Sequence, residues 1–338
     1  MTERRAEILG FIVREYIDAA APVSSKVIAE RHTLGISPAT IRNEMAYLER
    51  EGYLTHPHTS AGRVPTTGAY RYFVEHLMRE TTVPADERRM IEHQFHQLDM
   101  ELEEWIRLAA AVLASRASTA SLVTAPRARR PQLRRLALVP VGESTVLLLV
   151  VLQDGAVKRR VVHTGASRSA RALGRLAEGL NAQFLDLSGE EVRAECSHLQ
   201  TIEQEIGMQV AELMDDVELH GSLELYRYGL AQMLRQPEFA EAEKAEKVVG
   251  VLESPGYLEN VLAEIGVSHR GVQVIIGGEG RWPEISDFSL VVARYGLAWQ
   301  SPGVVGIVGP TRMSYARNIP MVSFVADLMS TLMQGWDM

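Results

Sequence analysis

Cysteine is almost absent from this chain of 338 residues. Cys196 is the only one, which excludes an intramolecular disulfide and a zinc finger built from cysteine pairs. No neighbouring motif marks Cys196 as a nucleophile, and a buried or incidental thiol is the favoured interpretation.

Long apolar runs are also missing. The longest, Val146 to Leu152, is too short to cross a membrane, and the first residues, MTERRAEILG, are charged rather than typical of a signal peptide. We therefore expect a cytoplasmic protein. Apolar residues make up 46% of the chain and charged residues 23%, as in ordinary globular proteins, and the length is sufficient for two or three domains.

Metal-ligand and nucleotide-binding motifs are incomplete. His56 and His58, like Cys196 and His198, have a spacing that metal ligands use, but neither pair has the further ligands that would close a site. The glycine-rich run 277–280 matches neither a dinucleotide fingerprint nor a phosphate-binding loop, so a loop between strands is favoured. We expect no metal, no cofactor and no enzymatic activity.

A turn near the C-terminus leaves two interpretations open. The run 309–312, Gly-Pro-Thr-Arg, could hold an anion through backbone amides and the guanidinium group of Arg312. Alternatively, Arg312 could pair with a carboxylate of its own domain. The sequence favours neither.

The informative stretch is Leu34 to Tyr72. Ser37 is a good N-cap, Pro38 suits the first helical position, and no helix breaker follows before Arg50. The apolar positions of this predicted helix, at i, i+4 and i+7, share one face and should pack inward: Ile41, Met45 and Leu48.

The opposite side of the same helix is polar. Thr40, Arg42, Asn43 and Tyr47 lie on the flanks or the far side, where a helix-turn-helix protein places the side chains that touch base edges in the major groove. Upstream, a short helix from Ser24 to Glu30 and a tight connection at Gly35 complete the expected order. Ser24 and Ser25 would then lie on a phosphate, as helix N-termini commonly do.

A hairpin should follow the helix. Gly52 supplies the stop, the run 53–55 is extended, and HPHTSAGRVP holds hydroxyls, histidines and an arginine with no acid. Such a wing can lay side chains and backbone N–H groups against phosphate or into a minor groove. The residues we assign to this contact are His58, Thr59, Ser60 and Arg63.

Charge supports this interpretation locally rather than globally. The whole chain carries 35 basic and 43 acidic residues, for a net charge of −8. Acidic residues are absent from Arg31 to Asn43 and from Gly52 to Val74, the two segments that would approach DNA. Short acid-free runs also occur by chance in small helical domains. Weak positive charge predicts modest non-specific affinity, so binding would rely on specific contacts and on two subunits reading together.

Two long motifs carry a resemblance to a known family. SPATIRNEMAYLEREGYLTHPHTSAGRVPTTGAYRYFVEHL resembles the winged-helix domain of the HrcA family, the heat-inducible transcription repressors of bacteria, and GVVGIVGPTRMSYARNI is similar to its C-terminal signature. The resemblance implies a repressor that binds the inverted-repeat operator CIRCE ahead of chaperone operons. It also implies that the GroEL chaperonin maintains the repressor in its active form.

The expected fold is multidomain α+β. Residues 1–80 would form a winged helix-turn-helix domain, and residues 81–118 a connector built on one long helix from 85 to 118. Six strands would share one α+β domain, formed by 119–165 plus 250–338: Leu136–Val141, Thr145–Leu152, Val157–Val162, Val272–Ile276, Phe288–Tyr295 and Gly303–Val308. The family resemblance implies that this domain is GAF-like and is interrupted at 165–250 by a mainly helical dimerisation domain.

The predicted insertion holds much apolar surface. We expect one long helix from Glu190 to Val217, with Ile202, Ile206 and Val210 on one side. Burial against an identical copy would remove this surface from water and favours a homodimer; packing onto the chain's own body is the alternative. A ligand-sensing regulator and an enzyme with a DNA-binding head are the other functional classes, and no sequence motif identifies a ligand or a catalytic set.

Overall fold

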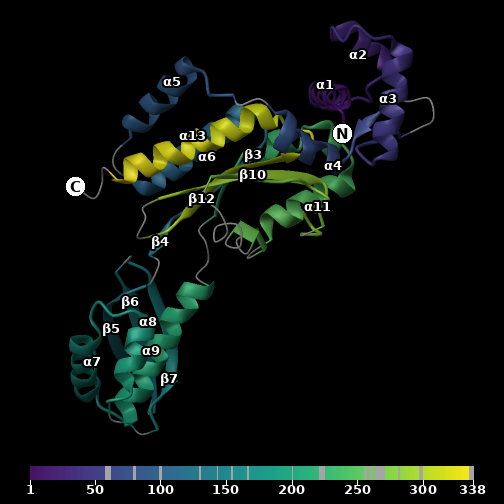
Figure 1. Cartoon of the computed structure of the whole chain (residues 1–338). Coiled ribbons are helices and arrows are strands. Elements are labelled where there is room, and N and C mark those ends of the chain that lie inside the picture. The colour runs from purple at the N-terminus through teal and green to yellow at the C-terminus, as the bar shows by residue number, and fades with distance from the viewer. Residues whose placement is uncertain are drawn as a thin grey trace. The chain divides into compact units, whose positions relative to one another are not determined.

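A computed structural model shows two compact units, which are described separately (Figure 1). Unit 1 comprises Met1–Pro126, Glu224–Leu297 and Pro302–Met338; unit 2 comprises Arg127–Leu223 and Ala298–Ser301. The residues that the structure describes are 1–57, 62–78, 81–98, 101–128, 131–142, 144–153, 155–165, 167–199, 201–220, 225–254, 257–258, 261–262, 271–280, 282–296 and 300–334.

Unit 1 begins with three helices and a two-stranded hairpin. The helices are α1 (Glu3–Ala19), α2 (Ser25–Arg31) and α3 (Pro38–Arg50), and the strands β1 (Leu54–Thr55) and β2 (Val64–Pro65) pair antiparallel. The predicted start of α3 is confirmed, because the Ser37 side chain accepts a hydrogen bond from the Thr40 amide. Ile41, Met45 and Leu48 are buried, so the predicted inward face is also confirmed.

The connector differs from the prediction. After α4 (Thr67–Tyr72) and the π-helical turn Phe73–Leu77, the structure has two helices, α5 (Ala85–His96) and α6 (Leu102–Ala117), in place of one helix over 85–118. The start of α5 lies beside the end of α6, since Arg116 Nε is 3.3 Å from Glu87 Oε1. Folding back lets Ile91 and Phe95 be buried, whereas a single extended helix would leave them in water. The prediction of a stiff connector is therefore wrong.

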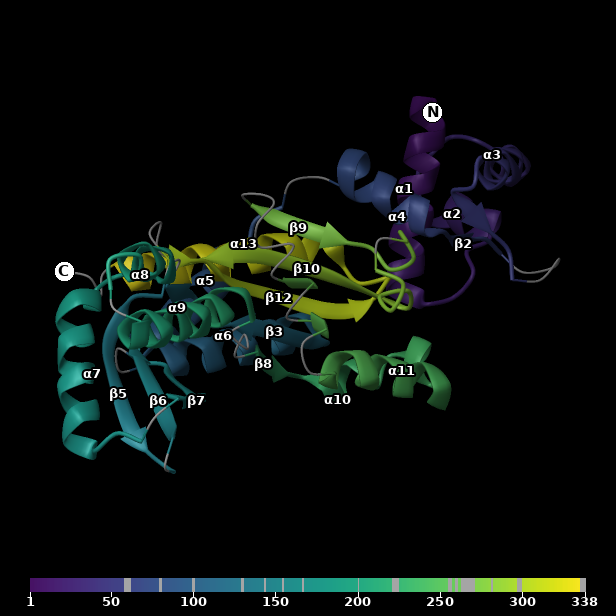
Figure 2. The same cartoon turned by 90° about the horizontal axis from the view of Figure 1, so that it is seen from below.

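A five-stranded antiparallel sheet forms the body of unit 1. Its order is β8 (Leu225–Tyr228), β3 (Ala120–Thr124), β12 (Gly303–Pro310), β10 (Phe288–Tyr295) and β9 (Val272–Ile275), as Figure 2 shows. Side chains from α6 and α13 (Tyr315–Gln334) cover one face. The other face is covered by α10 (Leu230–Met233), the 3-10 turn Pro237–Phe239 and α11 (Ala242–Glu253). Burial on both faces explains why β10 and β12 read as continuous apolar runs.

Unit 2 has its own sheet. Strands β5 (Leu133–Pro140), β6 (Thr145–Leu152) and β7 (Val157–His163) pair antiparallel, and β4 (Arg127–Ala128) pairs with β11 (Gln300–Ser301). The helices are α7 (Ala170–Phe184), α8 (Gly189–Cys196) and α9 (Thr201–His220). The predicted six-stranded domain is therefore wrong, as is a single helix from Glu190 to Val217. Strand propensity identifies strands, but it does not identify their partners.

The core of unit 2 accounts for the apolar surface that the sequence left without a partner. Ile206, Val210 and Met214 of α9 are buried together with Leu148 and Val150 of β6. The helical segment does not need a second copy to remove these side chains from water, because the three strands belong to the same compact unit. The main segment of this unit runs from Arg127 to Leu223, whereas the sequence prediction placed the insertion at 165–250.

Candidate nucleic-acid interface

The outward face of α3 carries exposed polar side chains. Arg42 and Asn43 are exposed, and Thr40 is half-buried with its hydroxyl 3.0 Å from that of Ser37. Ala39, Ala46 and Arg50 share the outward ridge with Asn43, because their positions repeat at three and four residues. Small side chains beside Asn43 let a helix approach base edges closely. The sequence interpretation missed Arg50, although the same helical spacing identifies it.

Tyr47 lies on one flank of this helix between two arginines. Arg5, from α1, lies over the Tyr47 ring with its guanidinium carbon 3.5 Å from the ring centroid, and Arg50 is 5.6 Å from the same centroid. Arg5 Nε also donates to Glu44 at 2.7 Å, and this hydrogen bond raises the pKa of Arg5. The sequence did not indicate Arg5, because its contact with α3 depends on how α1 packs.

The start of α2 presents only one of its two predicted serines. Ser24 is the N-cap and accepts a hydrogen bond from the Val27 amide at 3.3 Å. Ser25 is buried in the first turn, with 8% of its surface exposed. A DNA contact at this helix start would therefore use Ser24 and the backbone amides rather than the Ser25 hydroxyl.

The base of the wing is tied to the helices on both sides. Arg63 and Val23 exchange two backbone hydrogen bonds, of 2.8 and 2.9 Å. A Cβ at Gly62 would overlap the Val23 backbone, so this close approach requires glycine. Arg63 Nη2 is 2.7 Å from Glu49 Oε2, and His56 contacts the same carboxylate. Three of the predicted wing contacts lie outside the described residues: His58, Thr59 and Ser60.

Glu49 is a residue that sequence reasoning missed. It closes the end of α3 onto the wing by holding Arg63 and His56 together. Arg63 is consequently not a free cation, because its side chain is only 22% exposed and its charge is compensated. Any contact of Arg63 with phosphate has to compete with this ion pair.

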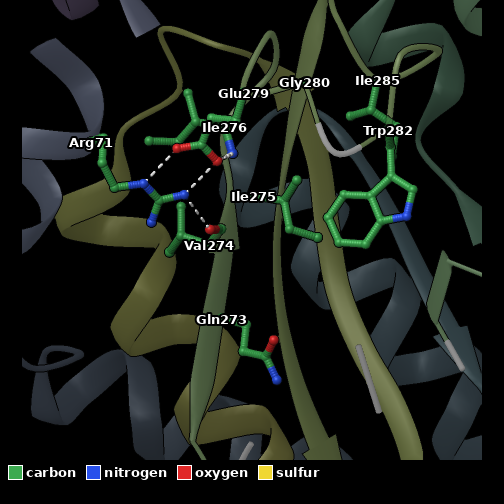
Figure 3. Close-up of a pocket in the computed structure, with 9 residues that line it drawn as sticks. All are labelled: Arg71, Gln273, Val274, Ile275, Ile276, Glu279, Gly280, Trp282 and Ile285. Carbon is green, nitrogen blue, oxygen red and sulfur yellow. Dashed lines mark hydrogen bonds and ion pairs between the residues drawn. The ribbon is translucent and has the colours of Figure 1, made fainter. Parts of the chain in front are cut away.

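The N-terminal helices and hairpin, which we call the helical head (residues 1–78), are joined to the sheet of unit 1 by an ion pair between an arginine and a glutamate. Arg71 of α4 donates to both Glu279 oxygens, at 2.6 and 2.5 Å, and to the Val274 carbonyl at 2.9 Å. Figure 3 shows the guanidinium directed at the Glu279 carboxylate. Thr67 also donates to the Gly277 carbonyl at 3.0 Å. The glycine-rich run 277–280 thus connects β9 to β10, as the sequence predicts, and holds the head.

The cavity beside this joint is small. It measures about 170 Å³ and is lined by Arg71, Glu279, Trp282 and the β9 strand, among others. Its charged groups already pair with each other. We therefore interpret it as part of the joint between head and sheet rather than as a ligand site.

Arg312 resolves one of the open sequence interpretations. It pairs with Glu238, donates to Gln236 Oε1 at 2.8 Å, and donates to the Ile17 carbonyl at 3.0 Å. The carboxylate interpretation is correct for the geometry of this turn, and the guanidinium group is occupied by protein acceptors.

The single cysteine is held in the core of unit 2. Cys196 is buried in unit 2, and burial raises the pKa of its thiol, so it is protonated near neutral pH. Within the described ranges, no cluster of three or more histidine, cysteine or acidic side chains has metal-binding geometry. In the same ranges, every helix is too short or too polar to cross a membrane.

A second exposed surface lies on unit 2. Alternate residues of β6 are buried against the helices, and the others face outward. Val139 and Val161 lie directly opposite Leu147, on either side, and Val157 lies opposite Val151. Val139, Val157 and Val161 are 41%, 60% and 56% exposed. We call the apolar part of this surface the outer apolar patch: Val139, Leu147, Leu149, Val151, Val157 and Val161. Two exposed arginines lie on the same face, Arg159 opposite Leu149 and Arg135 opposite Val151.

Helices with a solvent-facing recognition helix and a hairpin wing are the arrangement of a DNA-binding transcription regulator. Residues 103–319 match the model of the HrcA protein C terminal domain. The chain is 40% identical to the heat-inducible transcription repressor HrcA of Herpetosiphon aurantiacus, over 98% of this chain and 95% of that one. Identity to the repressors of Roseiflexus castenholzii and Chloroflexus aurantiacus is 40% and 38%, over 98% of this chain and 94% of each relative. The chain belongs to the HrcA family of heat-inducible transcription repressors.

The chain is similar in fold to a solved structure. The crystal structure of a hypothetical protein at 2.2 Å resolution aligns with a TM-score of 0.62 at 25% identity, covering 99% of both chains. The same fold is thus present in a protein of known structure.

Proposed function

We propose that this chain represses chaperone operons by binding the inverted-repeat operator CIRCE as a homodimer. The observation that carries the proposal is the outward face of α3, where Arg42 and Asn43 are exposed on a helix whose other side is buried. Occupying the operator would exclude RNA polymerase. The family to which the chain belongs, the HrcA repressors, supports the same function.

The proposed base contacts lie in the first half of α3. Arg42 suits guanine and Asn43 suits adenine, because each can form two hydrogen bonds to one base edge in the major groove. Thr40 would contact a neighbouring base or sugar. Ser24, the amide of Ser25 and the wing residues His58, Thr59, Ser60 and Arg63 would contact the backbone or minor groove.

The proposed dimer uses the outer apolar patch. Contiguous exposed apolar surface on a sheet is costly in water and commonly marks a protein interface. A second copy offers the same patch, and twofold symmetry matches an inverted-repeat operator. The rest of the proposed layout is a winged helix, a GAF-like sheet domain in unit 1, and unit 2 as the inserted dimerisation domain.

The proposed control is thermal. Heat would unfold a marginally stable part of the chain and release the operator, and a GroEL-type chaperonin would return the repressor to its active form. A gel-shift titration on a CIRCE duplex and a scrambled duplex, with and without chaperonin, tests this. We expect selective binding that chaperonin improves. Selective binding indifferent to chaperonin would contradict the proposed control, and equal binding to both duplexes would contradict the proposed target.

A further inference from the structure

The second half of α3 lies beyond the residues proposed to contact bases. The 13 residues of α3 span about 20 Å at 1.5 Å per residue, and recognition helices contact base edges with their N-terminal residues. If the first half of α3 reads bases, we expect its second half to lie nearer a phosphate strand. One flank of that second half carries Glu44, Tyr47 and Arg50, and Arg5 of α1 contacts Glu44 and Tyr47.

Arg5 and Arg50 are held in place by the same ring. Arg5 stacks at 3.5 Å from the Tyr47 centroid, and Arg50 is within the range of cation–π attraction at 5.6 Å. A guanidinium that is stacked on an aromatic face loses less freedom on binding than a free one. Its planar set of five N–H donors matches a phosphate, and the contact with Glu44 engages the one on Nε.

We propose that Tyr47 orients Arg5 and Arg50 as a two-arginine phosphate clamp beside the second half of α3. The clamp rests on the proposed DNA-binding function and gives Tyr47 a different part in it from base recognition. Tyr47 is then a positioning residue, and Arg5 and Arg50 are the residues that touch DNA.

Glu44 gives Arg5 a second effect. A carboxylate beside a phosphate strand repels DNA, and the Arg5 ion pair at 2.7 Å compensates that charge. A simple charge-shielding role for Arg5 therefore has to be separated from a direct phosphate contact.

The salt dependence of binding tests the clamp. Each phosphate contact contributes about one unit to the slope of log affinity against log salt concentration. Arg5→Gln and Arg50→Gln should each make the negative slope shallower by about one unit, equally on operator and scrambled DNA. Tyr47→Ala should make the slope shallower by about two units. Tyr47→Phe, which keeps the ring, should have a slope close to that of the parent protein. Arg14→Gln is the matched control, since Arg14 also lies on α1 over aromatic rings but contacts Phe11 and Phe73.

Two results would overturn the clamp. If Tyr47→Phe loses as much operator binding as Tyr47→Ala, the hydroxyl makes the contact and the ring is not a support. If the double variant Arg5→Gln/Glu44→Gln recovers the parent slope, Arg5 only shields Glu44. Melting curves of each variant separate both results from loss of folding. Failure of the parent protein to select the operator would instead contradict the proposed function.

Discussion

The two exposed faces of this protein differ in chemistry. The outward face of α3 in unit 1 carries Arg42, Asn43 and Arg50, whereas the outer face of the unit 2 sheet carries mainly valine and leucine, flanked by Arg135 and Arg159. Polar side chains remain solvated until DNA replaces the water, but apolar side chains are more stable when covered. The difference fits the proposed function, in which the α3 face contacts DNA and the unit 2 face joins a second copy.

The two faces also differ in how the chain supports them. Below α3 lie Ile41, Met45 and Leu48, which fix the helix to its neighbours. Below the outer apolar patch lie Leu148, Val150 and the helices of unit 2. Each face therefore rests on its own hydrophobic core, so a substitution on one face should leave the packing beneath the other face unchanged.

The largest expected effect comes from a charge in the outer apolar patch. Val161→Asp should produce a monomer, because an unpaired carboxylate cannot be buried in an apolar interface without a large cost. Loss of the second head should weaken operator binding by about 100-fold or more. Sedimentation velocity and a binding titration measure the two effects. Leu185→Asp is the control, since Leu185 is similarly exposed (52% against 56%) but lies off the sheet. A Val161→Asp variant that stays dimeric would contradict the assigned interface.

A smaller effect is expected at the centre of the α3 face. Asn43→Ala should cost about 1–3 kcal/mol of discrimination between operator and scrambled DNA, because a bidentate contact to one base is lost. Competition titrations measure this difference. Gln94→Ala removes an exposed amide from α5 and serves as the control. Discrimination that survives Asn43→Ala would show that Asn43 does not read a base.

The wing should contribute less and without sequence preference. Arg63→Ala removes one cation and should weaken binding to all sequences alike, with the salt slope flattened by about one unit. Arg89→Ala, on α5, removes an exposed and ion-paired arginine away from the wing. If the loss at Arg63 were confined to the operator, the residue would be a sequence reader.

The smallest expected effect concerns the start of α3. Ser37→Ala removes the N-cap and should lower the free energy of unfolding by about 1 kcal/mol. Chemical denaturation measures the change, and Ser37→Asn should retain the cap. Unchanged stability in Ser37→Ala would mean that packing alone fixes this helix end.

Features set by neighbouring residues were predictable from sequence. The Ser37 cap, the inward face of α3 and the glycine-rich loop all depend on residues close together in the chain. The break between α5 and α6 was not predictable, because apolar residues continue at helical spacing through Ile91, Phe95, Leu98, Leu102 and Trp105. That break follows from tertiary packing, which helical periodicity does not record.

Contacts between distant segments were the other source of error. The strands 133–140, 145–152 and 157–163 were identified close to their observed bounds, but were placed in one domain with the three later strands, whereas they form a sheet of their own. The same limit applies to the site. Asn43 and Arg42 could be found from helical spacing, whereas Arg5 reaches Glu44 and Tyr47 of α3 only because α1 packs beside α3.

The most direct test of this division between the two faces compares a full inverted-repeat duplex with a single half-site. Fluorescence anisotropy titrations at fixed salt would measure both affinities with the parent protein. If one face reads DNA and the other joins two copies, the full repeat should bind about 100-fold tighter or more. Equal affinity for the full repeat and the half-site would contradict the account, because a single copy would then be sufficient for recognition.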